Sequence, residues 1–353
     1  MEILHSPAKG NTGRTMISRE SFLHSLPPFK EYLSSNDVEL EQAIIEAHAK
    51  NPWFYPEFTR HGIQAIAIEF LDIEKCSNWL NTYDSSSHPG KRIGLIMAGN
   101  IPLVGFHDLF CVLASGHNAV IKLSEKDPVL PKFILDKWTA LSPELSTSIR
   151  YTEKLEGFDA VVATGSNNSA RYFEYYFRAY PHILRQNRNG IAVITGEETR
   201  EDLQLLGKDI FLYYGLGCRS VSKIFIPRGY DFTAMEIAFE EWNYLADHVK
   251  YRNNLDYNYA IYIINKVPHI NLGHLILKED DAIASRIGCV HYSYYDDANE
   301  LKTNLEEKRN EIQCLVSCKP FADWEHILPG KSQNPSLEQY ADGVDTMQFL
   351  SSL

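Results

Sequence analysis

The segment Ile93-Gly-Leu-Ile-Met-Ala98 is a short, fully apolar run, as a strand covered on both faces requires. The turn Gly99-Asn-Ile-Pro102 follows it, and a helical stretch over 103–115 leads to a second apolar strand over 119–123. A strand, a helix and a strand in this order form a βαβ unit, in which the two strands are parallel. The segment therefore predicts an α/β fold built on a parallel sheet.

The same alternation continues along the chain. The residue pattern predicts a helix over 129–141, a strand over 159–163, a helix over 169–178 and a strand over 191–194. Strands that alternate with helices imply a parallel sheet with a crevice at the carboxyl ends of its strands. We therefore expect the ligand chemistry at that edge.

The regions on either side have patterns of their own. Residues 17–90 predict mainly helices, because 38–49 places apolar residues at helical spacing behind Asn36 and Asp37 as candidate N-caps. The segment 85–90 is typical of a turn or linker.

A second α/β lobe is expected beyond Thr199, which can cap a helix together with Asp202. Its expected strands are 221–227, 260–264, 288–294 and 312–316, and its expected helices lie near 232–249 and 297–309.

The charge balance argues against two classes of partner. The chain has 353 residues, with 34 Lys and Arg against 46 Asp and Glu, a net charge of −12 and no block of basic residues. Nucleic acid and anionic membrane surfaces are therefore not expected to bind it. Residues 1–16 have no apolar core, and no apolar run approaches the length of a bilayer span. We expect a cytoplasmic protein without membrane insertion.

The six cysteines do not suggest a disulfide framework in a chain of this size. Cys314 and Cys318 form the only close pair, and no matching pair of His or Cys lies nearby to complete a tetrahedral metal site. The 13 histidines are scattered. We expect no bound metal, and each cysteine is interpreted as a separate thiol.

Cys218 differs from the other cysteines in its surroundings. It lies in Gly215-Leu-Gly-Cys-Arg-Ser220, directly ahead of the strand 221–227, whereas Cys111 lies inside an apolar run. Gly215 and Gly217, which precede it, allow a sharp bend and a close approach of substrate, which favours a nucleophile. The alternative is a small residue in a turn without a chemical role. The local sequence leaves both interpretations open.

Four elements succeed one another along the chain: the Asn-x-Pro turn at 100–102, the Lys122-Leu-Ser124-Glu125 element, the turn Thr164-Gly165-Ser166 and Gly217-Cys218. Their order resembles that of the aldehyde dehydrogenase superfamily. The resemblance implies an aldehyde-dehydrogenase-like fold, with a Rossmann-type parallel-sheet cofactor domain and a second α/β catalytic domain.

One branch of the superfamily is more similar still. The motifs 215–220, Pro329-Gly-Lys-Ser-Gln-Asn-Pro335 and Ala341-Asp-Gly-Val-Asp-Thr346 resemble the LuxC-type acyl-CoA reductases, which reduce fatty acyl thioesters to aldehydes. The resemblance covers about 91–350. It implies a cofactor domain over 91–196 with the tail 331–353, a catalytic domain over 197–330, a separate helical region over 1–90, and a homo-oligomer.

The resemblance assigns the catalytic roles to Cys218 and Asn100. The Cys218 thiolate would attack the carbonyl carbon of an acyl-CoA or acyl-carrier thioester and form an acyl-enzyme. The Asn100 side chain would donate, with the backbone N–H of Cys218, to the developing oxyanion. His107 lies on about the same face of the expected helix as Asn100, and we interpret it as a packing residue.

The same resemblance assigns a nicotinamide dinucleotide to the sheet edge. Thr164, Gly165 and Ser166 would meet its pyrophosphate at a helix N-terminus, and the element that contains Lys122, Ser124 and Glu125 would hold the adenosine ribose. An acidic residue at the ribose favours NADH, whereas the resembled branch uses NADPH. We expect NADPH, with NADH as the alternative.

One feature of the superfamily is missing. Hydrolytic aldehyde dehydrogenases carry a glutamate that activates water just over thirty residues before the cysteine, and the corresponding stretch here is Leu184-Arg-Gln-Asn-Arg-Asn-Gly190. Glu197 and Glu198 are expected to start the next helix instead. Without a general base the acyl-enzyme should persist until hydride reaches it, so the sequence predicts an acyl-CoA reductase. The alternatives are a hydrolytic aldehyde dehydrogenase and a silent relative that binds an acyl carrier.

Overall fold

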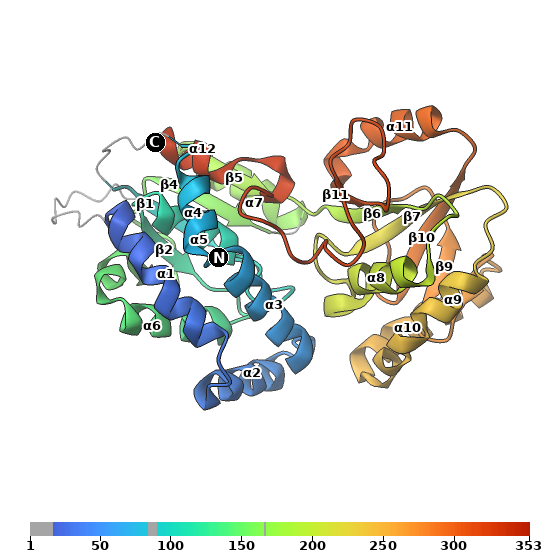
Figure 1. The fold of residues 1–353 in the computed structure, drawn as a ribbon, viewed down its shortest axis with the longest axis horizontal. Helices are drawn as coiled ribbons and strands as arrows, with labels where there is room; N and C mark the ends of the chain where they lie inside the picture. Colours follow the sequence, from blue (N-terminus) through green and yellow to red (C-terminus); the bar gives the residue numbers. More distant parts are fainter. Residues whose placement is uncertain (1–16, 84–89, 166) are drawn as a thin grey trace. The chain divides into compact units, whose positions relative to one another are not determined.

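The computed structural model describes residues 17–83, 90–165 and 167–353, which form two compact units (Figure 1). The first unit runs to Gln186 and resumes at Asn334, and the second spans Asn187–Gln333. The boundaries expected from the sequence lay at 196 and 330. They differ because β6 (Asn189–Val193) pairs with strands of the second unit.

The first unit contains a five-stranded parallel sheet in the order β3-β2-β1-β4-β5. The strands are β1 (Arg92–Ile96), β2 (Asn118–Lys122), β3 (Ile149–Tyr151), β4 (Ala160–Thr164) and β5 (His182–Arg185). The chain leaves β1 toward β2 on one side and later returns to β4 on the other. The order therefore reverses at β1, where a doubly wound sheet binds its ligands.

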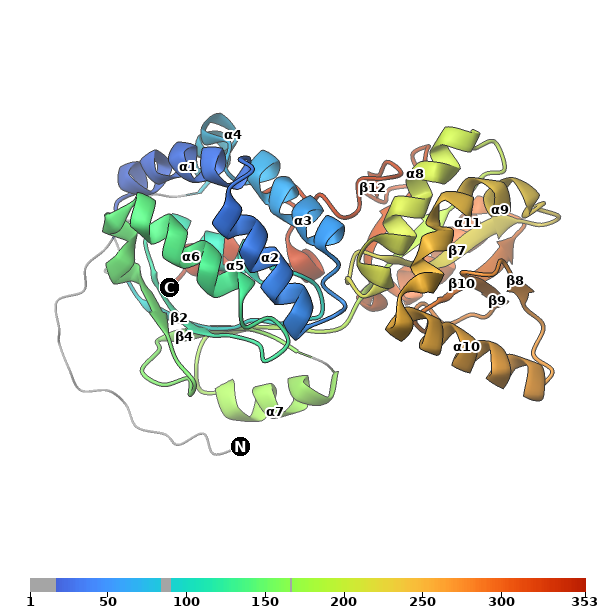
Figure 2. The same ribbon diagram turned by 90° about the horizontal axis from the view of Figure 1, so that it is seen from below.

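Helices cover both faces of this sheet, because alternate residues of each strand face opposite sides. Ala119 and Ile121 of β2 join one core, whereas Val120 between them joins the other. Figure 2 shows α7 on one side of the sheet and α1, α2, α5 and α6 on the other. The helices are α1 (Arg19–Leu33), α2 (Val38–Lys50), α3 (Pro56–Glu69), α4 (Ile73–Leu80), α5 (Phe106–Ala114), α6 (Leu130–Leu141), α7 (Asn167–Phe177) and α12 (Thr346–Ser351).

The N-terminal helices are part of this unit. The ring of Phe29 on α1 stacks on Trp138 of α6 with centroids 4.6 Å apart, and the Trp138 indole donates to Ser25 Oγ at 3.1 Å. Asp37 caps α2 by accepting from the amides of Glu39 and Leu40, as its position in the sequence predicts. The region 17–83 therefore shares its core with the parallel sheet.

The second unit contains a seven-stranded sheet in the order β12-β11-β6-β7-β10-β9-β8, in which only the pairing of β8 with β9 is antiparallel. Its remaining strands are β7 (Val221–Pro227), β8 (Ile270–Asn271), β9 (Ile276–Glu279), β10 (Cys289–Tyr295), β11 (Ile312–Val316) and β12 (His326–Ile327). Figure 1 shows α11 on one face and α8, α9 and α10 on the other. These helices are α8 (Arg200–Phe211), α9 (Thr233–Phe239), α10 (Val249–Ile264) and α11 (Ala298–Glu307).

Most elements lie where the sequence predicts them, and one predicted strand is wrong. Thr199 and Asp202 form the expected capping box at the start of α8. The expected strand at 260–264 is instead the last turn of α10. The buried residues of α10 are spaced by three and four positions, which is helical, and Leu255 and Tyr262 pack on the sheet. The run of apolar residues at its end is largely exposed, so its composition misleads.

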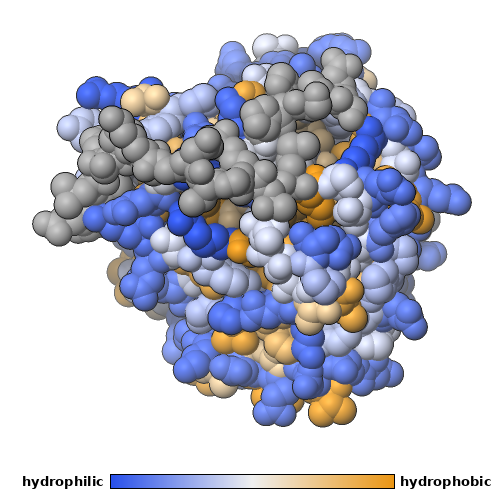
Figure 3. Space-filling view, turned by 90° about the vertical axis from the view of Figure 1, so that its left-hand side faces the viewer, coloured by the Kyte–Doolittle hydropathy of each residue, from blue (hydrophilic) through white to orange (hydrophobic). Residues whose placement is uncertain are grey.

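No helix in the described ranges is long and apolar enough to cross a membrane. On the face of the first unit in Figure 3, outside the grey residues, hydrophobic residues are scattered among hydrophilic ones.

Candidate active site

Asn100 lies in the turn that follows β1 and is half-buried. The preceding residue, Gly99, packs against the loop that follows β2. A Cβ atom at Gly99 would lie 2.6 Å from Ser124 Oγ and 3.0 Å from the backbone nitrogen of Asp127. Glycine is therefore required for the two loops to approach one another, and their contact fixes the backbone next to Asn100.

Asp127 holds the other end of this turn, a role that the sequence analysis missed. Its Oδ2 accepts from the amide of Leu103 at 3.0 Å, and Leu103 has a left-handed backbone with φ of 56°. Asp127 is 2 % exposed, and its Oδ1 has no hydrogen-bond partner among the described residues. Burial raises the pKa of Asp127 to about 6, although the amides of Leu103 and Leu130 oppose this.

The predicted cofactor residues lie along the same sheet edge as Asn100. Ile96, at the end of β1, pairs with Lys122 at the end of β2 on one side and with Ala163 of β4 on the other. The loops after these three strands therefore begin side by side. The structure thus brings the 122–125 element and the turn after β4 to the edge that carries Asn100.

Within this edge the predicted residues have different exposures. Lys122 and Ser124 are half-buried, and Glu125 is exposed. Thr164 and Gly165 are half-buried ahead of α7, whereas Ser166 lies outside the described residues.

Gly165 has a packing reason of its own. A Cβ atom there would lie 2.7 Å from the Phe173 ring and 2.9 Å from Ser169 Cβ, both on α7. Glycine therefore lets the turn approach the start of α7, where helix amides can bind a phosphate group.

Cys218 belongs to the second unit and lies in a tight turn. The amide of Ser220 donates to the carbonyl of Gly217 at 3.0 Å, so that Cys218 is the second residue of a closed β-turn. Its side chain is half-buried. The turn follows two residues with left-handed backbones, Tyr213 with φ of 56° and Tyr214 with φ of 57°. This conformation is costly for bulky residues and persists only where the surrounding structure enforces it.

Neighbouring strands fix the back of this turn. The amide of Gly190 on β6 donates to the carbonyl of Ser220 at 3.0 Å, and a Cβ atom at Gly190 would lie 2.6 Å from the carbonyl oxygen of Arg219. Cys314 on β11 places its Sγ 3.8 Å from the same carbonyl oxygen. Burial raises the pKa of Cys314 to about 12, which keeps it a neutral thiol.

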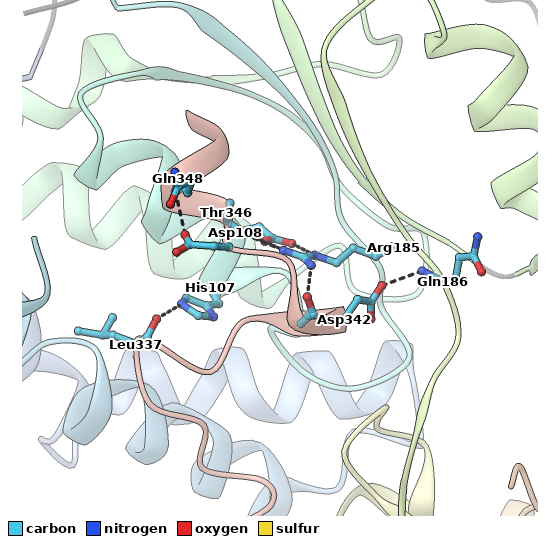
Figure 4. A network of polar contacts seen from close by, with 10 residues as sticks. His107, Asp108, Arg185, Gln186, Leu337, Asp342, Thr346 and Gln348 are labelled. Carbon is cyan, nitrogen blue, oxygen red and sulfur yellow. Dashed lines mark hydrogen bonds and ion pairs between the residues drawn. The ribbon is translucent and has the colours of Figure 1, made fainter. Parts of the chain in front are cut away.

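The stretch that corresponds to the family's glutamate contains a buried arginine instead. Arg185, at the end of β5, forms an ion pair with Asp108 of α5 and also donates to Thr346 Oγ1 and the carbonyl of Ala341 (Figure 4). Burial alone would raise the pKa of Asp108, but the charge and hydrogen bonds of Arg185 outweigh it and hold the pKa below its ordinary value. Asp108 is therefore a paired carboxylate inside the first unit.

The two glutamates near this stretch have structural partners, and neither begins a helix as the sequence suggested. Glu198 accepts from the amides of Thr195 and Gly196, and Glu197 forms an ion pair with Lys319. Helix α8 begins after them because Thr199 is its N-cap.

His107 packs as expected. Its ring stacks between Phe70 and Tyr340, and its Nε2 lies 3.1 Å from the carbonyl oxygen of Leu337 (Figure 4).

No cluster of three or more His, Cys, Asp or Glu side chains suited to a metal ion occurs in the described part of the chain. The first unit thus carries the Asn100 turn at its sheet edge, and the second unit carries the Cys218 turn.

The chain has the fold of the aldehyde dehydrogenases. It is similar to aldehyde dehydrogenase 21 from Physcomitrella patens, solved with the reaction product succinate, with a TM-score of 0.66 at 9 % identity over 96 % of this chain and 85 % of that one. An oxidoreductase from Marinobacter aquaeolei gives a TM-score of 0.64 at 13 % identity over 91 % and 80 % of the two chains.

Betaine aldehyde dehydrogenase from Staphylococcus aureus, solved as a double mutant with NAD⁺, gives a TM-score of 0.63 at 13 % identity over 88 % and 73 % of the two chains. No protein-family model matches the sequence. No curated protein matches it either.

Proposed function

We propose that the protein is an NADPH-dependent acyl-CoA reductase that forms a covalent acyl-cysteine at Cys218. The observation that carries the proposal is the closed turn at Cys218 in a chain with the aldehyde dehydrogenase fold. A thiol at the second position of a fixed turn can attack a carbonyl carbon without reorganising the backbone.

The residues of the chain divide the reaction into two steps. The Cys218 thiolate adds to the thioester carbonyl, the oxygen takes up negative charge, and collapse of this intermediate expels the CoA thiolate. Asn100 and the backbone N–H of Cys218 would donate to that oxygen. When bound, NADPH supplies the hydride that converts the acyl group to the aldehyde. Cys218 then leaves as thiolate and is ready for another cycle.

The stretch 184–190, which corresponds to the family's hydrolytic glutamate, contains no carboxylate, and this favours reduction over hydrolysis. Arg185 occupies the corresponding stretch and is held in an ion pair with Asp108, and Glu197 and Glu198 are engaged with neighbouring groups. We infer that none of these side chains acts as the base for water in the reaction. The acyl group is then expected to remain on sulfur until hydride transfer.

The sheet edge is suited to a dinucleotide. Gly165 permits a close turn between β4 and α7. On the other side of β1, Lys122 ends β2 and Glu125 follows it. Lys122 could attract the 2′-phosphate of NADPH, whereas Glu125 repels it. We propose NADPH from the resemblance to the LuxC-type reductases, and a comparison of its dissociation constant with that of NADH would test this choice.

The deciding experiment leaves out the reductant. The protein is mixed with a panel of saturated acyl-CoA thioesters, and we expect release of free CoA thiol in a one-to-one ratio to protein, with the acyl mass located on the peptide that contains Cys218. Cys218→Ala should release none. Cys318→Ala, another half-buried thiol of the second unit, is the matched control and should behave like the wild type.

The outcomes separate the alternatives. Continuous release of free fatty acid would indicate a hydrolytic enzyme. A chain that forms no acyl-cysteine with any thioester, including acyl carrier protein, would overturn the proposal and favour a silent acyl-carrier-binding protein.

A further inference from the structure

The segment 329–333 returns along the second unit just before the chain enters the first, and we call it the return segment. It contains most of the Pro329–Pro335 motif, for which the proposed mechanism has no use. We propose that the return segment positions the nucleophile turn, with Gln333 as the positioning residue and Asp209 as its anchor. The proposal rests on the proposed function in that it takes Cys218 as the nucleophile.

Asp209, near the end of α8, binds the return segment through both carboxylate oxygens. Its Oδ2 accepts from the amide of Gly330 at 2.6 Å, and its Oδ1 accepts from the amide of Ser332 at 2.9 Å. Asp209 is 1 % exposed, so water does not compete for these bonds. A carboxylate that bridges two alternate amides fixes the backbone between them.

The return segment also packs closely on α8. Gly330 has φ of 79°, and a Cβ atom there would lie 2.9 Å from Leu205 Cδ2 on α8. A side chain at this position would therefore both strain the backbone and push the segment off the helix. The position of residue 333 is thus set by α8, the same helix that leads into the nucleophile turn.

Gln333 connects this scaffold to the nucleophile turn. Its Nε2 donates to Ser220 Oγ at 3.2 Å, and both side chains are buried, at 8 % and 0 % exposure. Ser220 closes the turn, because its amide N–H donates a hydrogen bond to the carbonyl of Gly217. A shift of Ser220 would therefore displace Cys218 and its backbone N–H together, and that N–H is a proposed oxyanion donor.

The turn requires such a support because its entry is strained. Tyr213 and Tyr214, in the segment that leads into the turn, both have left-handed backbones. This conformation is costly for a bulky residue and holds only if the surroundings enforce it. Gly190 secures the backbone of Ser220, and Gln333 secures its side chain.

The test compares Gln333→Met, Ser220→Ala and their double variant. The control is Ser222→Ala, which removes a buried hydroxyl two residues further on that donates to the carbonyl of Ile283, away from the turn. Each variant is measured for urea stability, for acylation of Cys218 at saturating acyl-CoA, and for half-saturating acyl-CoA concentration.

We expect Gln333→Met and Ser220→Ala each to slow acylation roughly tenfold at an unchanged half-saturating concentration. The double variant should be no slower than the worse single one, because both remove the same bond. Ser222→Ala should lose stability but retain the wild-type rate. Equal slowing in Ser222→Ala, or additive losses in the double variant, would overturn the positioning role.

Hydrogen exchange makes the test independent of the reaction. Gln333→Met should speed amide exchange in the peptide over 216–221, which contains the Ser220 amide, and Ser222→Ala should not. Unchanged exchange there would also overturn the proposal. If the wild type forms no acyl-cysteine, the proposed function fails. Faster amide exchange in Gln333→Met would still show that Gln333 stabilises the turn.

Discussion

The guanidinium of Arg185 binds both carboxylate oxygens of Asp108, with Nη2 2.6 Å from Oδ1 and Nε 3.0 Å from Oδ2. The pair joins the end of β5 to α5, and Thr346 and Ala341 attach the C-terminal segment to the same guanidinium (Figure 4). Asp342 adds a bond to the amide of Gln186, the last residue before the chain leaves the first unit. The 341–346 motif thus fastens the end of the chain to the sheet.

Removal of one partner of this pair should be strongly destabilising. Asp108→Asn or Arg185→Met leaves the other charge buried without its counterion, which typically costs roughly 3–5 kcal/mol. The double variant Asp108→Leu with Arg185→Met should lose less than either single one. Urea unfolding followed by circular dichroism measures this, and a loss in the double variant equal to the sum of the single ones would contradict the pairing.

The same pair predicts a dependence on acidity. The pKa of Asp108 is lowered in the folded state, so its contribution to stability is present above its unfolded pKa and is lost as the pH falls through the lower folded value. The stability of the wild type relative to Asp108→Asn should therefore shrink below about pH 4. A difference that stays constant on acidification would show that the carboxylate is not stabilised by Arg185.

The oxyanion role of Asn100 predicts a large loss of rate with little loss of stability. Asn100→Ala removes one donor to the developing charge, which typically slows the step about 100-fold to 1000-fold. Asn51→Ala is the control, because Asn51 lies in the same unit and its side chain donates to the carbonyl of Lys126. Single-turnover acylation measures the effect, and a change below about threefold would remove Asn100 from the mechanism.

Asp127 predicts the opposite pH dependence to Asp108. Its pKa is raised to about 6 by burial, so the folded chain binds more protons than the unfolded chain between about pH 4 and 6, and the stability due to Asp127 falls as the pH rises. Asp127→Asn keeps an acceptor for the Leu103 amide and does not titrate. Its stability relative to the wild type should therefore increase by about 2 kcal/mol between pH 4 and 7.

Urea unfolding at several pH values measures this difference. Asp136→Asn, an exposed carboxylate on α6, is a control for changes of net charge. If the difference in unfolding free energy between Asp127→Asn and the wild type does not change with pH, Asp127 is not a buried carboxylate at neutral pH.

The sequence could predict what depends on neighbouring residues. The apolar run at 93–98 gives β1, and Thr199 with Asp202 gives the start of α8, because both signals lie within a few residues. The run at 260–264 leads to a wrong strand prediction, because its apolar composition is typical of a strand. The buried positions of the whole helix α10 are spaced by three and four residues, which is helical.

The supports of the site could not be predicted, because their partners are distant in the sequence. Asp127 binds an amide 24 positions away, Arg185 a carboxylate 77 positions away and Asp209 an amide 123 positions away. The left-handed backbones at Tyr213 and Tyr214 also depend on tertiary packing, since neither residue type favours them. The residues proposed to carry the chemistry come from the order of motifs, whereas the groups that contact their turns could be identified only from the fold.

Glu125 predicts a change of cofactor preference. It is exposed at the sheet edge, where its charge would repel the 2′-phosphate of NADPH. Glu125→Gln should strengthen NADPH binding about threefold to tenfold and leave NADH binding nearly unchanged, the modest size reflecting screening by solvent. Tryptophan fluorescence measures both dissociation constants. Equal changes for the two cofactors would place Glu125 away from the ribose.

Lys223, a fully buried lysine on β7, predicts a gain of stability in alkaline solution. Its ammonium donates to Ser293 Oγ and to the carbonyl of Asp280 in the second unit. Burial lowers the pKa of Lys223 to about 8, although Asp281 and Asp280 oppose this. Between this value and the ordinary 10.5 the unfolded chain binds more protons than the folded chain, so the stability due to Lys223 rises with pH.

Lys223→Met removes this titration and keeps a side chain of similar length. The stability of the wild type relative to Lys223→Met should rise by about 2 kcal/mol between pH 7.5 and 9.5. Ser293→Ala is the matched control, because it removes one hydrogen-bond partner of Lys223 but keeps the amine. The stability of Ser293→Ala relative to Lys223→Met should therefore still rise with pH. The prediction fails if the unfolding free energies of the wild type and of Ser293→Ala change with pH as that of Lys223→Met does. The ammonium of Lys223 would then be solvated in the folded state, and its burial beside β10 would be wrong.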